Sequence, residues 1–162
     1  MTSILDPRVQ EQIDSLGIDY EPLACDAHLA DTAEFCAHYD VSPEEACNAI
    51  LVALKTNPRS YVACLVRADT KLDVNHKVSD LVGIRRMSFA SAEETASLTG
   101  QMIGGVTIFA LPSDMPIYID QRVMERPRVI VGGGNRTSKV RLDPHALERL
   151  PNAKVVDIAV PR

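Results

Sequence analysis

The sequence of 162 residues has no tryptophan, and only 4% of its residues are aromatic. It also lacks long apolar runs: the segments 49–54 and 129–131 are far shorter than the roughly 20 residues that a membrane-spanning helix requires. Its start shows no basic region followed by an apolar segment, which a secretory leader would have. These absences predict a soluble, cytoplasmic protein, and 46% hydrophobic residues are enough for a proper core.

Several motifs of catalysis and cofactor binding are absent as well. The chain has no G-x-G-x-x-G or Gly-Lys-Ser/Thr pattern for phosphates, no G-x-S-x-G elbow for a serine nucleophile and no C-x-x-C pair. The four cysteines are therefore expected as reduced, buried thiols. A zinc site made of Cys25, His28, Cys36 and His38 is the alternative, but this spacing fits no common zinc module, so we predict neither a metal nor a cofactor.

The net charge of −5 is unevenly distributed along the chain. Residues 1–50 carry eleven acidic side chains against Arg8 alone, a balance of −10, so the remainder carries +5. Between residues 122 and 149, seven Lys and Arg side chains face three acidic ones. A polyanion-binding surface is one interpretation of this segment, but no aromatic residue is interleaved to stack on bases, which favours ordinary solvated charge.

Two glycine clusters are the most informative features that the chain does contain. The pair at 104–105 comes directly before a β-branched run, and the triplet at 132–134 follows the apolar segment 129–131. Because glycine has no Cβ, such loops let a ligand lie against the backbone and present N–H groups to an oxygen atom. We therefore expect the two loops to share one pocket, with simple tight turns as the alternative interpretation.

Capping residues and hydrophobic spacing predict short helices among many strands. The first helix begins at Asp6-Pro7 and ends before Gly17. Further helices are expected to start at Asp31, Ser42, Asp73, Ser91 and Asp143. Strands are expected at 20–23, 49–54, 61–66, 106–109, 117–119, 129–131, 140–142 and 155–159. Because strands outnumber the crossover helices of a regular βαβ fold, we predict one α+β domain over residues 1–162, with a mixed, curled sheet.

The order of these elements resembles the YbaK/EbsC family of aminoacyl-tRNA deacylases, which is similar to the editing domain inserted in bacterial prolyl-tRNA synthetases. Four short motifs at family-like separations carry the resemblance: Leu72-Asp73, Thr99-Gly100, Gly104-Gly105 and Gly132-Gly133-Gly134. It covers about residues 6–159 and implies a barrel-like mixed β-sheet surrounded by short helices.

The resemblance also implies a free-standing enzyme that hydrolyses the ester between a wrong amino acid and the 3′ end of a tRNA. Backbone N–H groups of Gly104 and Gly105 would stabilise the oxyanion, and a ribose hydroxyl would help to place the attacking water. The implied partners are a mischarged aminoacyl-tRNA and, as a second candidate, an aminoacyl-tRNA synthetase, with neither DNA nor a membrane involved. The expected substrate-binding residues are Thr107, Met102, Ile103, Gly132, Gly133 and Asn135.

Three positions depart from the family pattern. Asn48 stands where the family carries a lysine that contacts the ester, so a neutral amide replaces a full positive charge. Thr107-Ile108 replaces the family's Ser-Pro, which keeps a hydroxyl but loses the proline, and Lys139 stands where an acid is often found. We expect Asn48 to orient the ribose or the carbonyl as a third catalytic residue. The alternative is a catalytically impaired binding module that recognises an aminoacyl end or a protein partner.

Overall fold

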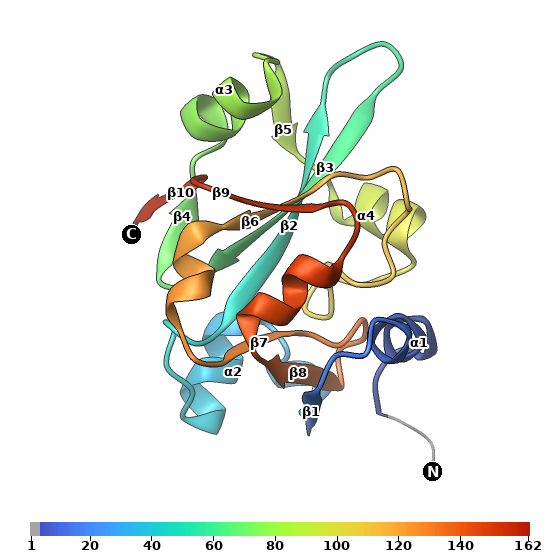
Figure 1. Cartoon of the computed structure of the whole chain (residues 1–162), viewed down its shortest axis with the longest axis vertical. Helices are drawn as coiled ribbons and strands as arrows, with labels where there is room; N and C mark the ends of the chain where they lie inside the picture. Colours follow the sequence, from blue (N-terminus) through green and yellow to red (C-terminus); the bar gives the residue numbers. More distant parts are fainter. Residues whose placement is uncertain (1–3) are drawn as a thin grey trace.

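The computed structural model describes residues 4–162, which are built around a five-stranded sheet (Figure 1). The helical segments are α1 (Pro7–Ser15), η1 (Ala27–Leu29), α2 (Thr32–Tyr39), η2 (Val74–Val78), α3 (Ser79–Val82), α4 (Ala92–Thr99), η3 (Gln121–Glu125) and η4 (Pro144–Arg149). The strands are β1 (Tyr20–Ala24), β2 (Cys47–Leu54), β3 (Ser60–Arg67), β4 (Thr70–Leu72), β5 (Met87–Phe89), β6 (Ile117–Asp120), β7 (Val129–Gly132), β8 (Ser138–Leu142), β9 (Ala153–Val156) and β10 (Ala159–Pro161). Within this part of the chain, the helices are too short to span a membrane.

The strands divide among three sheets. The central sheet has the order β5-β2-β3-β6-β9, in which β5, β2 and β3 are antiparallel and β3, β6 and β9 are parallel. A second, antiparallel sheet has the order β1-β8-β7, and β4 pairs with β10. One parallel bridge, between Ala46 and Ile130, links the start of β2 to β7. The predicted α+β class with a mixed sheet is confirmed; in place of one curled, barrel-like sheet, the described strands are shared among three sheets that do not close into a barrel.

Both faces of the central sheet are buried, which explains why β2 and β3 are continuous apolar runs. On β3, Ala63 and Leu65 belong to the hydrophobic cluster that α1, β7, β8 and η4 cover. The alternate residues Cys64 and Val66 belong to a second cluster with residues of η2 and of the C-terminal segment. In Figure 1, α1 and α4 lie near one another at one side of the molecule and α3 lies at the far end of the sheet.

Most of the predicted helix starts are confirmed. The side chains of Asp6, Asp73 and Asp143 accept hydrogen bonds from backbone N–H groups two or three residues further on. Ser91 and Glu94 form the predicted reciprocal capping box of α4. Each of these caps depends on residues only two or three positions apart, so the helix start depends little on the rest of the fold.

The predicted helix at Ser42 is wrong. Residues 43–45 form only a turn, in which the N–H of Glu45 donates to the carbonyl oxygen of Ser42 at 2.9 Å. The carbonyl oxygen of Glu45 in turn accepts a hydrogen bond of 2.9 Å from the N–H of Ile130. Pairing with β7 therefore starts the extended chain of β2 before a helix has room to form.

The predicted strand at 106–109 is also wrong, because a buried side chain supplies the hydrogen bonds that a neighbouring strand would give. Gln101 is fully buried; its Oε1 accepts from the N–H of Thr107 and its Nε2 donates to the carbonyl oxygen of Phe109, both at 2.9 Å. The predicted closing strand at 155–159 is interrupted and forms two strands, β9 and β10.

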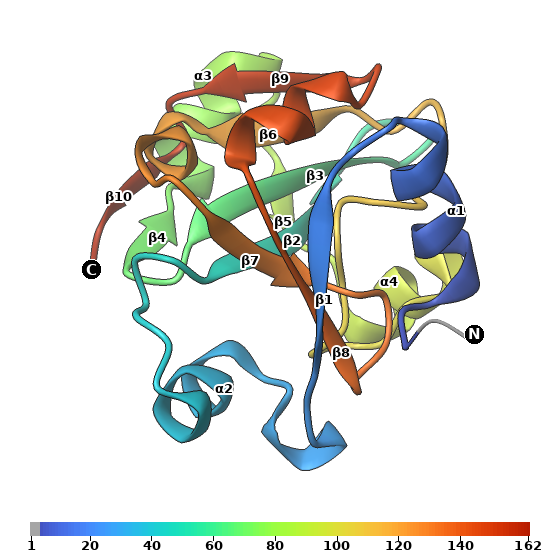
Figure 2. The same ribbon diagram turned by 60° about the horizontal axis from the view of Figure 1, so that its bottom comes forward.

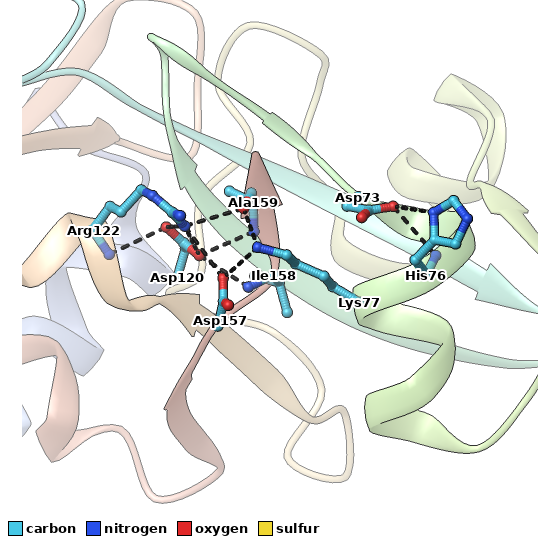
Figure 3. Close-up of polar contacts among 8 residues, drawn as sticks. All are labelled: Asp73, His76, Lys77, Asp120, Arg122, Asp157, Ile158 and Ala159. Carbon is cyan, nitrogen blue, oxygen red and sulfur yellow. Dashed lines mark hydrogen bonds and ion pairs between the residues drawn. The ribbon is translucent and has the colours of Figure 1, made fainter. Parts of the chain in front are cut away.

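A fully buried carboxylate causes that interruption (Figure 3). Oδ1 of Asp120, at the end of β6, accepts from the N–H groups of Ile158 at 3.0 Å and Ala159 at 3.1 Å. Its Oδ2 accepts from the N–H of Arg122 at 3.1 Å. The guanidinium of Arg122 and the ammonium of Lys77 both donate to the carbonyl oxygen of Ala159. The end of β6 thus fixes the path of the C-terminal segment.

We expect Asp120→Ala to lower the free energy of unfolding by about 2–4 kcal/mol, since it leaves two buried N–H groups and one partly buried N–H group without their acceptor. Urea unfolding followed by circular dichroism measures the change, with Asp114→Ala in an exposed loop as the control. Equal stability of the two variants would contradict a structural role for the buried carboxylate.

Candidate functional site

A cavity of about 280 Å³ lies where the start of β2, the loop around residue 104, the β7–β8 pair and the N-terminus of α2 meet. Figure 2 shows α2 at the lower end of the molecule, with β7 and β8 above it. The lining residues are Asp31, Thr32, Cys47, Asn48, Ala49, Ile50, Ile103, Gly104, Val106, Gly132 and Lys139. Residues from both glycine clusters thus line one cavity.

The glycine pair forms a turn whose two N–H groups differ in their hydrogen bonding. The N–H of Gly105 donates to the carbonyl oxygen of Met102 at 2.9 Å and is therefore engaged within the loop. The N–H groups of Gly104 and Val106, both in cavity-lining residues, have no hydrogen-bond partner within residues 4–162. Gly104 has a φ of +92°, a conformation that favours glycine. Two cavity-lining residues thus have a backbone N–H that is unpaired within the described chain.

Arg136 holds this loop from the β7–β8 turn. Its Nη1 donates to the carbonyl oxygen of Ile103, and its Nε donates to that of Ala27 at 3.0 Å. The same Nη1 lies 3.3 Å from Oδ1 of Asp31. A Cβ on Gly104 would collide with the guanidinium of Arg136. Glycine at this position therefore permits the close approach that joins the loop to the start of α2.

Lys139, on β8, carries a second positive charge into the same region. The residue is only 7% exposed, and its Nζ donates to the carbonyl oxygens of Ala30 at 2.6 Å and Gly104 at 2.9 Å. The Nζ also lies 5.5 Å from the centroid of the Phe35 ring. Burial lowers the pKa of this ammonium, while the nearby Cys25 thiol acts in the opposite direction.

Asn48 lies on the β2 side of the cavity. Its Oδ1 accepts a hydrogen bond from the hydroxyl of Thr32, the first residue of α2. Its Nδ2 has no acceptor in the described part of the chain and is available to a ligand. Asn48 and Thr32 also line a neighbouring cavity of about 520 Å³, which is otherwise lined mostly by apolar side chains of α2 and the segment that follows it.

The other expected site residues differ in burial and in whether they line the cavity. Thr107 is fully buried, is not among the lining residues, and its hydroxyl has no partner within residues 4–162. Met102 and Ile103 are 64% and 51% exposed, and Ile103 lines the cavity. Oδ1 of Asn135 accepts a hydrogen bond of 2.7 Å from the hydroxyl of Ser138, inside the β7–β8 turn.

The two glycines of the second cluster that were expected at the site serve close packing. A Cβ on Gly132 would collide with the carbonyl oxygen of Val106, and one on Gly133 would collide with the side chain of Ser138. Gly132 lines the cavity, whereas Gly133 does not.

Three polar cavity residues were not in the expected set: Asp31, Thr32 and Lys139. Asp31 precedes α2 but makes no side-chain capping bond, because Arg136 binds its carboxylate instead. In the sequence, Lys139 was one of seven basic residues between 122 and 149 and a departure from the family's acid. Within residues 4–162, no group of three or more His, Cys, Asp or Glu side chains is placed to hold a metal ion.

Comparison with known proteins relates this architecture to one family. The aminoacyl-tRNA editing domain matches the chain over residues 26–150. Among solved structures, the hypothetical protein APE2540 is 27% identical, with a TM-score of 0.84 over 94% of this chain and 99% of that one. A proposed trans-editing enzyme for prolyl tRNA synthetase is 25% identical, with a TM-score of 0.82 over 96% of this chain and 99% of its own.

Replacing Gly104 by alanine tests the geometry of the loop. We expect a loss of about 1–3 kcal/mol in unfolding free energy from the positive φ, and a further loss because the new Cβ displaces Arg136. Gly83→Ala is a matched control, since Gly83 also has a positive φ, of +71°, but open space around a Cβ. Urea unfolding should show a larger loss at Gly104; equal losses would contradict the close contact with Arg136.

Proposed function

Since the chain belongs to the aminoacyl-tRNA editing domain family, we propose that it hydrolyses, in trans, the ester bond of a mischarged aminoacyl-tRNA. The observation that carries this proposal is the cavity itself, which combines unused backbone and amide donors with mostly small or apolar lining residues. Its volume of about 280 Å³ is suited to one small amino acid at the 3′ end of a tRNA.

The donors match the charge that develops during ester hydrolysis. When water adds to the ester carbon, the carbonyl oxygen becomes an oxyanion, and each preorganised donor is worth about 3–4 kcal/mol of transition-state stabilisation. We assign this role to the N–H of Gly104 and the Nδ2 of Asn48. Gly105 contributes by closing the turn, because its own N–H is engaged with Met102.

The remaining polar groups suit the rest of an aminoacyl-adenosine. The carboxylate of Asp31 lines the cavity and is 53% exposed, so it offers an acceptor to the α-ammonium of the substrate. A ribose hydroxyl of the tRNA would help to place the attacking water, which removes the need for a protein nucleophile. The exposed side chains of Met102 and Ile103 offer apolar surface to the terminal adenosine.

Alanine, cysteine and serine are the amino acids to examine first. A structurally similar protein is described as a proposed trans-editing enzyme for prolyl tRNA synthetase. Near-isosteric amino acids differ by only about 1–3 kcal/mol in one pocket, so a second, hydrolytic site is required for fidelity. A synthetase that presents the mischarged tRNA is a second partner in this proposal.

A binding module of the same fold is the second candidate. The observation that favours it is Asn48, a neutral amide whose carbonyl is occupied by the hydroxyl of Thr32. Such a module would bind an aminoacyl end or a protein partner without turnover.

Deacylation of Ala-, Cys- and Ser-tRNA separates the two candidates. We expect turnover of at least one substrate by the wild type, and a loss of about 10²-fold in Asn48→Ala, because one oxyanion donor is removed. Asn75→Ala, at an exposed asparagine, is the matched control and should keep full activity. Absence of turnover by the wild type on every charged tRNA would support the binding module and contradict the deacylase.

A further inference from the structure

The ammonium of Lys139 is a buried positive charge with two hydrogen bonds to carbonyl oxygens and no ion pair in the described chain. Within residues 4–162 it is the one cationic side chain among the cavity-lining residues. No carboxylate of the described chain lies within ion-pair distance of it. Burying an ammonium without an anionic partner is costly, so a protein that merely needed to join two loops would do so at lower cost with a neutral donor.

One of the three N–H groups of the Lys139 ammonium has no hydrogen-bond acceptor in the described chain. An ammonium carries three N–H groups, and two of them are directed to the carbonyl oxygens of Ala30 and Gly104. The third has no acceptor in the described chain, although the residue is 93% buried and lines the cavity. A single N–H that remains free on a positioned, poorly hydrated cation is well suited to bind an oxygen that gains negative charge.

We propose that Lys139 is a catalytic residue that donates its third N–H to the carbonyl oxygen of the scissile ester. The inference rests on the proposed deacylase function and names a group that the neutral Asn48 does not supply, a full positive charge at the oxyanion. The same ammonium binds the carbonyl oxygen of Gly104, and the Gly104 N–H shares a peptide unit with the carbonyl of Ile103, which Arg136 binds. The charge and the backbone donor are therefore held as one unit.

The step balances without any further reactant. A water oxygen forms a bond to the ester carbon, and the carbonyl π electrons move to the oxygen beside Lys139, which remains protonated throughout. The tetrahedral intermediate then reforms the carbonyl, and the bond to the ribose oxygen breaks. The ribose oxygen takes the proton that the water loses, which gives the free tRNA hydroxyl and the amino acid.

The test compares Lys139→Gln with a matched control, Lys154→Gln, at an exposed lysine on β9. With the charged tRNA that the wild type hydrolyses, we expect kcat to fall about 10²–10³-fold in Lys139→Gln and to stay unchanged in Lys154→Gln. A second variant, Asn48→Lys in the Lys139→Gln background, returns a cation to the cavity from β2. We expect it to recover kcat at least tenfold, and by a larger factor than Asn48→Lys gives in the wild-type background, because only the double variant lacks the charge of Lys139.

A measurement on the unaltered protein keeps the inference testable if Lys139→Gln does not fold. A 3′-amide analogue of the aminoacyl-adenosine, which resists hydrolysis, should shift the side-chain NMR resonance of Lys139 in 13C-lysine-labelled wild type and leave that of Lys154 in place. An unchanged Lys139 resonance at saturating analogue would overturn the inference.

The two proposals fail in different ways. A wild type that hydrolyses no charged tRNA contradicts the deacylase function itself, and with it the role of Lys139. A wild type that is active, together with a folded Lys139→Gln variant within threefold of its kcat, leaves the function in place and overturns the role of Lys139.

Discussion

The candidate site depends on two cations from the β7–β8 region that hold the carbonyl groups of one glycine loop. Arg136 binds the carbonyl of Ile103 and Lys139 binds that of Gly104, while each also binds a carbonyl in the segment 27–30. The two cations thus join the glycine loop to the segment 27–30, which lies far from it in the sequence. The cations bind only carbonyl oxygens of this loop, and the N–H of Gly104 has no partner within residues 4–162.

A second constraint keeps the rest of that loop in place without a strand. The side chain of Gln101 binds the backbone at Thr107 and Phe109, so this apolar segment is buried with those polar groups paired. Gln101 thus positions the end of the loop beside the cavity, and backbone donors that are already positioned need little reorganisation when an oxyanion forms. In the proposed reaction, the charge on Lys139, the N–H of Gly104 and the Nδ2 of Asn48 supply the stabilisation.

The sequence predicted those features that depend on neighbouring residues. The capping residues of α1 and α4 and the apolar strands at 49–54 and 61–66 are local signals, and the structure confirms them. The motifs around the glycine pair and triplet indicated the family, and the match to the aminoacyl-tRNA editing domain confirms it. Residues 106–109 were predicted wrongly because their hydrogen bonds come from one side chain, which no periodicity reveals.

The role of Lys139 could not be predicted for a similar reason. On the sequence it is one of several basic residues between 122 and 149, and the pattern there favoured solvated charge. Its burial depends on β8 pairing with both β1 and β7, and on the segment at Ala30 that supplies one of its acceptors. Such long-range packing decides whether a lysine is exposed on a surface or lines a cavity.

The most direct measurement is a crystal structure of the protein with the hydrolysis-resistant 3′-amide analogue bound. The central claim is that the cavity between β2 and the glycine loop binds the acyl group, with its carbonyl oxygen held by Lys139 and Gly104. The expected result is that oxygen at about 2.7–3.1 Å from both the Nζ of Lys139 and the backbone nitrogen of Gly104. An acyl group in the neighbouring apolar cavity beside α2, with Lys139 untouched, would contradict it.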